Sequence, residues 1–159
     1  MRPPAIGIRS ALMLCCAMCL TPSPASALFI VNQPWVRPAT IGQTTEAYVN
    51  LTSTDGAKLV AVRTEAAEAV AIRAPGTTAV TAPGVTLPPG KLIALAPGRY
   101  RIALKKLLRT LHLGDRVLLT LRIEQDDGSQ QDIPMDAEVR LRSPIDDERR
   151  AHSHTHAPH

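Results

Sequence analysis

The chain has 159 residues, of which 18 are Lys or Arg and 14 are Asp or Glu, and aromatic residues make up 3%. This length is enough for one ordinary domain with a sizeable core. The basic residues are scattered and the aromatic residues are few, which excludes the basic, aromatic-bearing surface typical of nucleic-acid-binding proteins.

The N-terminal residues have the features of a secretory signal peptide. Arg2 and Arg9 flank the start of the chain without any acidic residue, an uninterrupted apolar run follows at 11–20, and Ala25-Ser26-Ala27 provides an A-x-A cleavage site. The apolar run is about half the length that a membrane-spanning helix needs. We therefore predict a signal peptide at 1–27, no membrane span in the mature chain, and a secreted, periplasmic protein.

All three cysteines lie in that apolar run, at positions 15, 16 and 19. They are predicted to leave with the signal peptide, so that the mature chain has no disulfide, no thiolate metal site and no cysteine nucleophile. The alternative is lipid attachment at Cys15 or Cys19, but the residues before them do not form the small-residue pattern that such processing prefers. Loss of Arg2 and Arg9 reduces the 18 basic residues to 16, and with 14 acidic residues the formal charge of the mature chain is +2.

Alternating apolar and polar residues predict β-strands through the rest of the domain. Pro97-Gly98 predicts a tight turn, Asp126–Ser129 predicts a hairpin turn, and the one predicted helical turn lies at Lys105–Leu111. Short strands at near-regular spacing, with 14 prolines and 9 glycines between them, indicate an all-β sandwich or barrel. The predicted strands are 46–53, 58–65, 68–74, 91–96, 99–107, 116–125 and 133–142.

The strand pattern ends after Arg142. Residues 143–159 contain a dense charge run and almost no apolar residue, so they cannot bury enough surface to order themselves. We predict a folded domain at 28–142 and a flexible, histidine-rich C-terminal tail at 143–159.

Several stretches of the domain resemble the periplasmic copper chaperones of the PCu(A)C type. They are Trp35-Val36-Arg37, residues 46–70 with the Ala47-Tyr48 strand, and residues 87–121, which include Pro97-Gly98 before Tyr100 and then Gly114-Asp115. The resemblance implies a cupredoxin-like Greek-key β-sandwich. It also implies a role in delivering Cu(I), with partners among cytochrome oxidase assembly or copper-handling proteins.

The copper ligands of that family are absent from the matching positions of this chain. Arg73 stands where the family has a first histidine, and Ala74-Pro75 and Ala79 stand where it has methionines. The family's His-x-Met corresponds to Arg101-Ile102-Ala103. Cu(I) prefers soft thioether and imidazole donors, and a guanidinium has no lone pair to offer. We therefore predict that the Cu(I) site within the domain is lost.

Four of the five histidines lie in the last eight residues, at His152, His154, His156 and His159. In an extended segment, side chains at i and i+2 point to the same side and lie about 6.5 Å apart. Imidazole donors favour Cu(II), Zn(II) or Ni(II) over Cu(I). We predict metal binding by these four residues, with copper(II) as the first candidate and zinc or nickel as others; the alternative is a solvated chain end.

A second hypothesis concerns Arg73 and Arg101, which the fold would place at one end of the sandwich near Arg99, Lys105 and Lys106. Guanidinium groups recognise carboxylates and phosphates with two parallel hydrogen bonds. This end could therefore hold an acidic partner, which would make the domain a non-metal adaptor. The alternative is that the arginines only solvate a surface once used by a metal.

The remaining candidate residues do not form a catalytic set. His112 is the only histidine outside the tail, which leaves a Ser-His-Asp arrangement almost nothing to draw on, and we predict that the protein is not an enzyme. Met135, the one methionine after the signal peptide, lies in an alternating strand and is predicted to fill the core.

Overall fold

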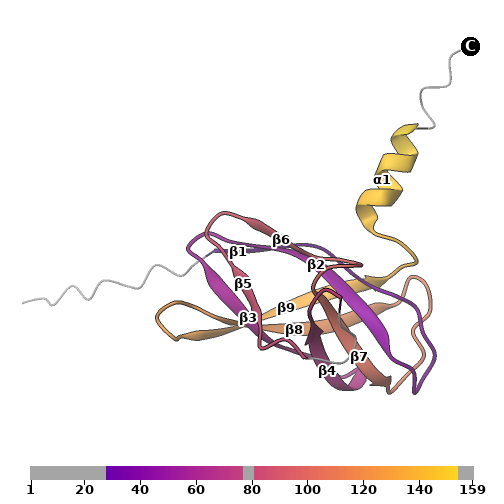
Figure 1. The fold of residues 1–159 in the computed structure, drawn as a ribbon. Coiled ribbons are helices and arrows are strands. Elements are labelled where there is room, and N and C mark those ends of the chain that lie inside the picture. Colours follow the sequence, from indigo (N-terminus) through magenta and orange to yellow (C-terminus); the bar gives the residue numbers. More distant parts are fainter. Residues whose placement is uncertain (1–27, 77–80, 154–159) are drawn as a thin grey trace, which may run out of the picture.

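Nine strands form a single curled sheet, which confirms the all-β prediction (Figure 1). The computed structural model describes residues 28–76 and 81–153, so the predicted signal peptide lies outside the described residues. The order across the sheet is β4-β7-β2-β1-β9-β8-β3-β5, and β6 also pairs with β2. The elements are β1 (Phe29–Val36), β2 (Thr45–Ser53), β3 (Ala57–Arg63), β4 (Ala67–Arg73), β5 (Val85–Leu87), β6 (Leu92–Leu95), β7 (Arg101–Leu107), β8 (Arg116–Glu124), β9 (Gln130–Val139) and α1 (Pro144–Ser153).

The core lies inside the curl of the sheet. Strand β8 shows the underlying alternation, because Leu119 is fully buried whereas the preceding Leu118 is 63% exposed. Successive side chains of a strand point to opposite faces, so every second residue joins the core. Strand β1 connects the two halves of the sheet, since it pairs antiparallel with β2 and parallel with β9.

The seven predicted strands are confirmed as β2, β3, β4 and β6 to β9, with ends that shift by a few residues. Strand β1 was missed because a register shift between Asn32 and Trp35, with a positive φ at Gln33, breaks its alternation. Strand β5 was missed because it has only 3 residues. The helical turn predicted at Lys105–Leu111 is wrong. Strand β7 continues to Leu107, and its backbone pairs with β4 up to that residue.

Both predicted turns are confirmed, but they have different consequences. Asp126–Ser129 closes a hairpin between β8 and β9, where the amide of Gln125 donates to the carbonyl of Ser129 at 2.9 Å. At Pro97-Gly98 the amide of Arg99 donates to the carbonyl of Ala96 at 2.9 Å. Strands β6 and β7 do not pair with each other there, because both run antiparallel along the same edge of β2.

The segment after Arg142 contains a helix at Pro144–Ser153, which the sequence analysis did not expect. Ser143 caps the helix, because its Oγ accepts from the amide of Ile145 at 3.3 Å. Pro144 suits the first helical position, and the acidic first turn complements the helix dipole. Figure 1 shows α1 projecting away from the sheet. Within the described ranges, no helix has the length and apolar character needed to cross a membrane.

Candidate functional site

A row of large side chains crosses four neighbouring strands on the outer face of the sheet. Trp35 of β1 lies opposite Tyr48 of β2, and Arg73 of β4 lies opposite Arg101 of β7. Tyr48 and Arg101 are adjacent in this row, because Ala47 and Ile102 pair one residue earlier in the register. Their chain neighbours Val36, Ala47, Ile72 and Ile102 point into the core, so the row lies on the opposite face of the sheet. Trp35 and Tyr48 are nevertheless buried on that face.

Arg101, Glu46 and Tyr48 form one connected polar network. Nε of Arg101 donates to Oε1 of Glu46 at 2.7 Å, and the hydroxyl of Tyr48 donates to Oε2 of the same carboxylate. Nη1 of Arg101 also donates to the carbonyl of Ala74 at 3.3 Å. The side chain of Arg101 is 13% exposed and that of Glu46 is 34% exposed, so water screens the pair only in part.

The network keeps the Tyr48 phenol protonated. Burial raises the pKa of Tyr48, and the hydrogen bond to Glu46 and the negative charge of Glu46 raise that pKa further. The Trp35 and Tyr48 rings lie with centroids 4.5 Å apart at 37°, and the Arg37 guanidinium lies 5.9 Å from the centroid of the Tyr48 ring. These ring contacts hold Tyr48 in place.

Arg73 lies beside this network, and one nitrogen of its guanidinium group lacks a hydrogen bond to the described residues. The structure brings Arg73 and Arg101 together as directly paired residues, as the sequence hypothesis expected. Nη1 of Arg73 is buried and has no hydrogen-bond partner among the residues that the structure describes. Buried polar atoms in native proteins nearly always have hydrogen-bond partners, so we expect an acceptor for this nitrogen. The matching position Ala79 lies outside the described residues.

The other basic residues expected near this pair are dispersed. Lys105 lies further along β7, opposite Ala69. Lys106 forms an exposed ion pair with Glu68 at 3.3 Å, and Arg99 lines a separate groove. Only Arg73 and Arg101 therefore form the close pair.

The row does not fit Cu(I). Ala103 lies opposite Ala71 where the family resemblance would place a thioether, and the two guanidinium groups offer no lone pair. Both oxygens of the Glu46 carboxylate already accept hydrogen bonds. Over residues 28–76 and 81–153, no group of three or more His, Cys, Asp or Glu side chains could hold a metal ion.

The four predicted tail ligands lie at the end of the chain, after the sheet. His152 belongs to α1, whereas His154, His156 and His159 lie outside the described residues. The backbone at His152 is helical, so the i, i+2 spacing of an extended segment does not apply there. His112 is exposed, with Nδ1 3.7 Å from Oδ2 of Asp115, and Met135 is buried in the core as predicted.

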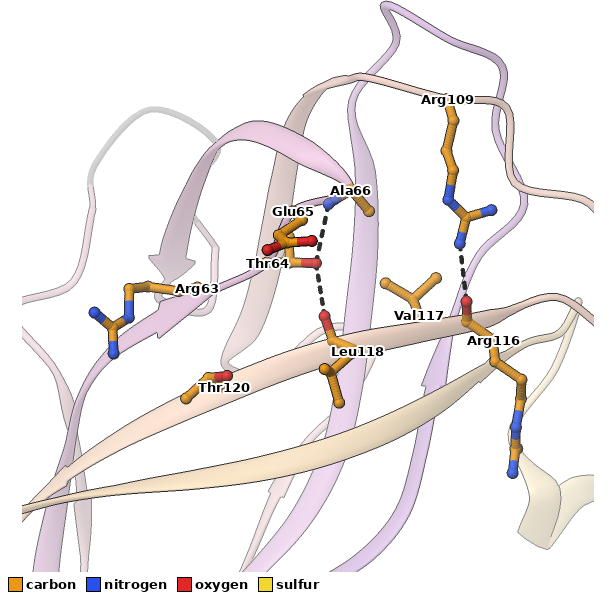
Figure 2. A pocket seen from close by; sticks show the side chains of 9 residues that line it. All are labelled: Arg63, Thr64, Glu65, Ala66, Arg109, Arg116, Val117, Leu118 and Thr120. Atoms are coloured by element: carbon orange, nitrogen blue, oxygen red, sulfur yellow. Dashed lines mark hydrogen bonds between the residues drawn. The ribbon is translucent and has the colours of Figure 1, made fainter.

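Sequence reasoning missed a groove of about 680 Å³ where β3 leaves β8 (Figure 2). The hydroxyl of Thr64 donates to the carbonyl of Leu118 at 2.7 Å, and Nη2 of Arg109 donates to the carbonyl of Arg116 at 2.8 Å. These side chains cap the edge of β8, and the three arginines of the groove all contact carboxylates. The arginines are Arg63, which bonds Asp132, Arg109, which lies 3.4 Å from Asp115, and Arg116, which lies 3.2 Å from Asp136.

Comparison with known proteins shows which family this chain matches. Residues 30–139 match a family described as LpqE-like, a lipoprotein family. No curated protein matches the chain. The apo PCuAC domain from PmoF1 is 27% identical, with a TM-score of 0.61, over 72% of this chain and 94% of that domain.

Two copper-containing structures share the fold. The copper-bound PCuAC domain from PmoF2 is 18% identical, with a TM-score of 0.58, over 74% of this chain and 100% of that domain. The Cu(I) form of DR1885 from Deinococcus radiodurans is 24% identical, with a TM-score of 0.55, over 73% of this chain and 81% of that protein. These similarities confirm the cupredoxin-like fold that the sequence predicted.

Proposed function

Because the chain belongs to the LpqE-like family and has the PCuAC fold, we propose that it is an extracytoplasmic, copper-chaperone-like protein whose domain no longer holds Cu(I). In this proposal a signal peptide at 1–27 directs the chain to the periplasm. Its C-terminal histidines, His152, His154, His156 and His159, capture Cu(II), or Zn(II) or Ni(II) in its place. Such a role is non-enzymatic.

One observation supports the proposal that the Cu(I) site within the domain is lost. The 2.7 Å ion pair between Arg101 and Glu46 stands where the family resemblance puts a histidine ligand. Arg73, at the other histidine position, is the directly paired neighbour of Arg101. A cation entering this row would meet two permanent positive charges and one carboxylate that is already engaged.

Capture by the tail is supported by the chemistry of the C-terminal residues and by the direction of α1. The helix carries the chain away from the sheet (Figure 1). Asp146 and Asp147 in its first turn add negative charge. Of these two, Asp147 lies 3.5 Å from Nη1 of Arg140, which joins α1 to the end of β9.

The test is a calorimetric titration of Cu(II), Zn(II) and chelator-buffered Cu(I). It compares residues 28–159, the same chain ending at Arg150, and a full-length variant with all four tail histidines changed to alanine. We expect Cu(II) binding by the first form only, and Cu(I) binding by none. His112→Ala is the matched control and should bind like the unchanged chain. Equal Cu(II) binding by all forms would place the site in the domain and contradict the assignment.

A second candidate function is docking of an acidic partner at Arg73 and Arg101. It is favoured by Nη1 of Arg73, which has no hydrogen-bond partner within residues 28–76 and 81–153. Arg73 as a whole is only partly buried, so a carboxylate of a partner can approach its guanidinium group. Arg73→Gln is the appropriate variant, because changing Arg101 would also break its pair with Glu46. Under this candidate, Arg73→Gln abolishes binding of an aspartate-rich peptide and leaves metal binding unchanged; unchanged peptide binding would exclude it.

A further inference from the structure

The curled sheet has an open seam between β5 and β6. These two strands are consecutive, but β5 pairs with β3 and β6 pairs with β2, and among the described residues the two do not pair with each other. They diverge from the connection at 88–91 (Figure 1). Each strand therefore has one backbone edge that faces the seam.

A groove of about 390 Å³ occupies this seam. One wall is formed by residues 84–86 at the start of β5, and the other by residues 92–94 of β6. Pro75, Arg99 and Tyr100 complete the lining of the groove. We call this cavity the β5–β6 groove.

The walls suit an extended chain. Strand edges without a partner present unused amide and carbonyl groups, and proteins usually protect such edges with charges or a covering segment. Strand β6 has the sequence LIAL, with no charge of its own, and Leu92 is 58% exposed. An apolar strand edge beside a groove is the geometry that peptides use when they add a strand to a sheet.

The positive charge in the β5–β6 groove favours extended segments that carry an acidic residue. Arg99 is the only charged residue among its lining residues, and no carboxylate lies within an ion-pair distance of Arg99 in the part of the chain that the structure describes. The groove in Figure 2 differs, because each of its three arginines contacts an acidic side chain of the domain. Arg99 is therefore the cation that an incoming carboxylate can neutralise.

We propose that the β5–β6 groove binds an extended acidic segment of a partner protein by strand addition, with a carboxylate of that segment on Arg99. The backbone of the segment pairs with the free edges of β5 and β6. Apolar side chains of the segment pack against Leu92, which is 58% exposed, and the hydroxyl-bearing residues Thr86 and Tyr100 also line the groove. This site goes beyond the metal function and does not depend on the tail or on Arg73.

The test uses a phage-displayed library of random eight-residue peptides, selected against residues 28–159. We expect enriched peptides that alternate β-branched and polar residues and contain Asp or Glu near one end. Synthetic copies should shift the amide resonances of Val85–Leu87 and Leu92–Leu95 in a ¹⁵N-labelled sample. Arg99→Glu should weaken their binding at least tenfold, whereas Lys91→Glu, at the other end of β6 and outside the groove lining, should change it less than twofold.

Several outcomes would overturn the proposal. They are a lack of enrichment, enriched peptides without acidic residues, and shifts that map to the groove of Figure 2 or to Arg73. Shifts of the same amides that depend on protein concentration without peptide would identify a second copy as the occupant, and would also overturn it. Binding of Cu(II) by the tail is measured separately, so failure of the metal proposal leaves this test unaffected. Unchanged amide resonances of β8 in Arg99→Glu would show that the variant is folded.

Discussion

The two faces of strand β2 differ in what they contribute to the protein. On the inner face, Ala47, Val49 and Leu51 are buried in the core. On the outer face, Glu46 and Tyr48 belong to the network that reaches Arg101. Because alternate residues of one strand serve the two faces, the chemistry of the outer face can change while the packing of the core is kept. The comparison explains how this fold can carry arginines at the positions where the family resemblance puts metal ligands.

The two faces should also differ in energy. The inner face is stabilised by burial of apolar surface, which contributes about 25 cal/mol per Å². The outer face is held by ion pairs and hydrogen bonds that water screens in part, and each of these contributes only about 0.5–3 kcal/mol. Substitutions on the inner face should therefore cost the most stability.

The sharpest contrast lies between two consecutive leucines of β8. Leu119→Ala removes a fully buried side chain and should lower the free energy of unfolding by about 2–5 kcal/mol, through lost burial and the cavity left behind. Leu118→Ala, on the exposed face, should change it by less than about 0.5 kcal/mol. Urea denaturation of both variants measures the difference. Equal costs would contradict the assignment of Leu119 to the core and Leu118 to the exposed face.

The next contrast lies within the outer face. Glu46→Gln removes the charge that Arg101 pairs with but keeps an acceptor for the Tyr48 hydroxyl. We expect a loss of about 1–3 kcal/mol, below the roughly 3–5 kcal/mol seen when one partner of a fully buried pair is removed, because Glu46 is partly exposed. The matched control is Glu68→Gln, whose partner Lys106 is exposed, with an expected loss below about 0.5 kcal/mol. Similar losses in both variants would show that the Arg101 network adds nothing.

How much the sequence could predict follows the same division between faces. Inner-face alternation shows in the amino-acid pattern, so β2, β8 and β9 were predicted from the sequence alone. Strand β5 has too few residues to show a period, and its place in the sheet depends on β3. The helix α1 was missed although Ser143, Pro144 and the acidic first turn are ordinary helix-start signals, because the low apolar content of the segment was given more weight.

Only those residues of the candidate site that match ligand positions of the family could be predicted from the sequence. It identified Arg73 and Arg101, and the structure pairs them directly. It did not identify Glu46 as a partner of Arg101, because the two lie 55 residues apart and no local pattern joins them. The open seam between β5 and β6 was equally hidden, since it depends on which strands each of them pairs with.

A smaller effect is expected for Tyr48→Phe, which removes one hydroxyl from the network. At neutral pH the loss of its hydrogen bond to Glu46 should cost about 0.5–1.5 kcal/mol. The pKa of Tyr48 is raised in the folded protein, so the stability it confers is complete below the ordinary tyrosine pKa of about 10 and is lost as pH rises towards the folded pKa. The free energy of unfolding measured from pH 7 to 11 should therefore fall less steeply in Tyr48→Phe. Tyr100→Phe is the control and should retain the steep alkaline fall.

The smallest effect is expected for Asp132, at the exposed end of the β8–β9 hairpin. Nε and Nη2 of Arg122 donate to its two oxygens at 2.9 and 3.2 Å, and Nη2 of Arg63 also bonds Oδ2. The hydrogen bonds and charge of Arg122, and then those of Arg63, hold the pKa of Asp132 below its usual value. A depressed folded pKa means that the stabilisation is present above the ordinary aspartate pKa of about 3.9, and is lost as pH falls through the folded pKa.

Asp132→Asn should therefore lower the urea midpoint slightly at pH 7 and flatten its decline below about pH 4. Two further variants rank the partners, because Arg122 makes two hydrogen bonds to Asp132 and Arg63 makes one. Arg122→Gln should raise the pKa of Asp132, followed by carboxyl NMR titration, more than Arg63→Gln does. The reverse order would show that Asp132 depends mainly on Arg63, which lines the groove in Figure 2.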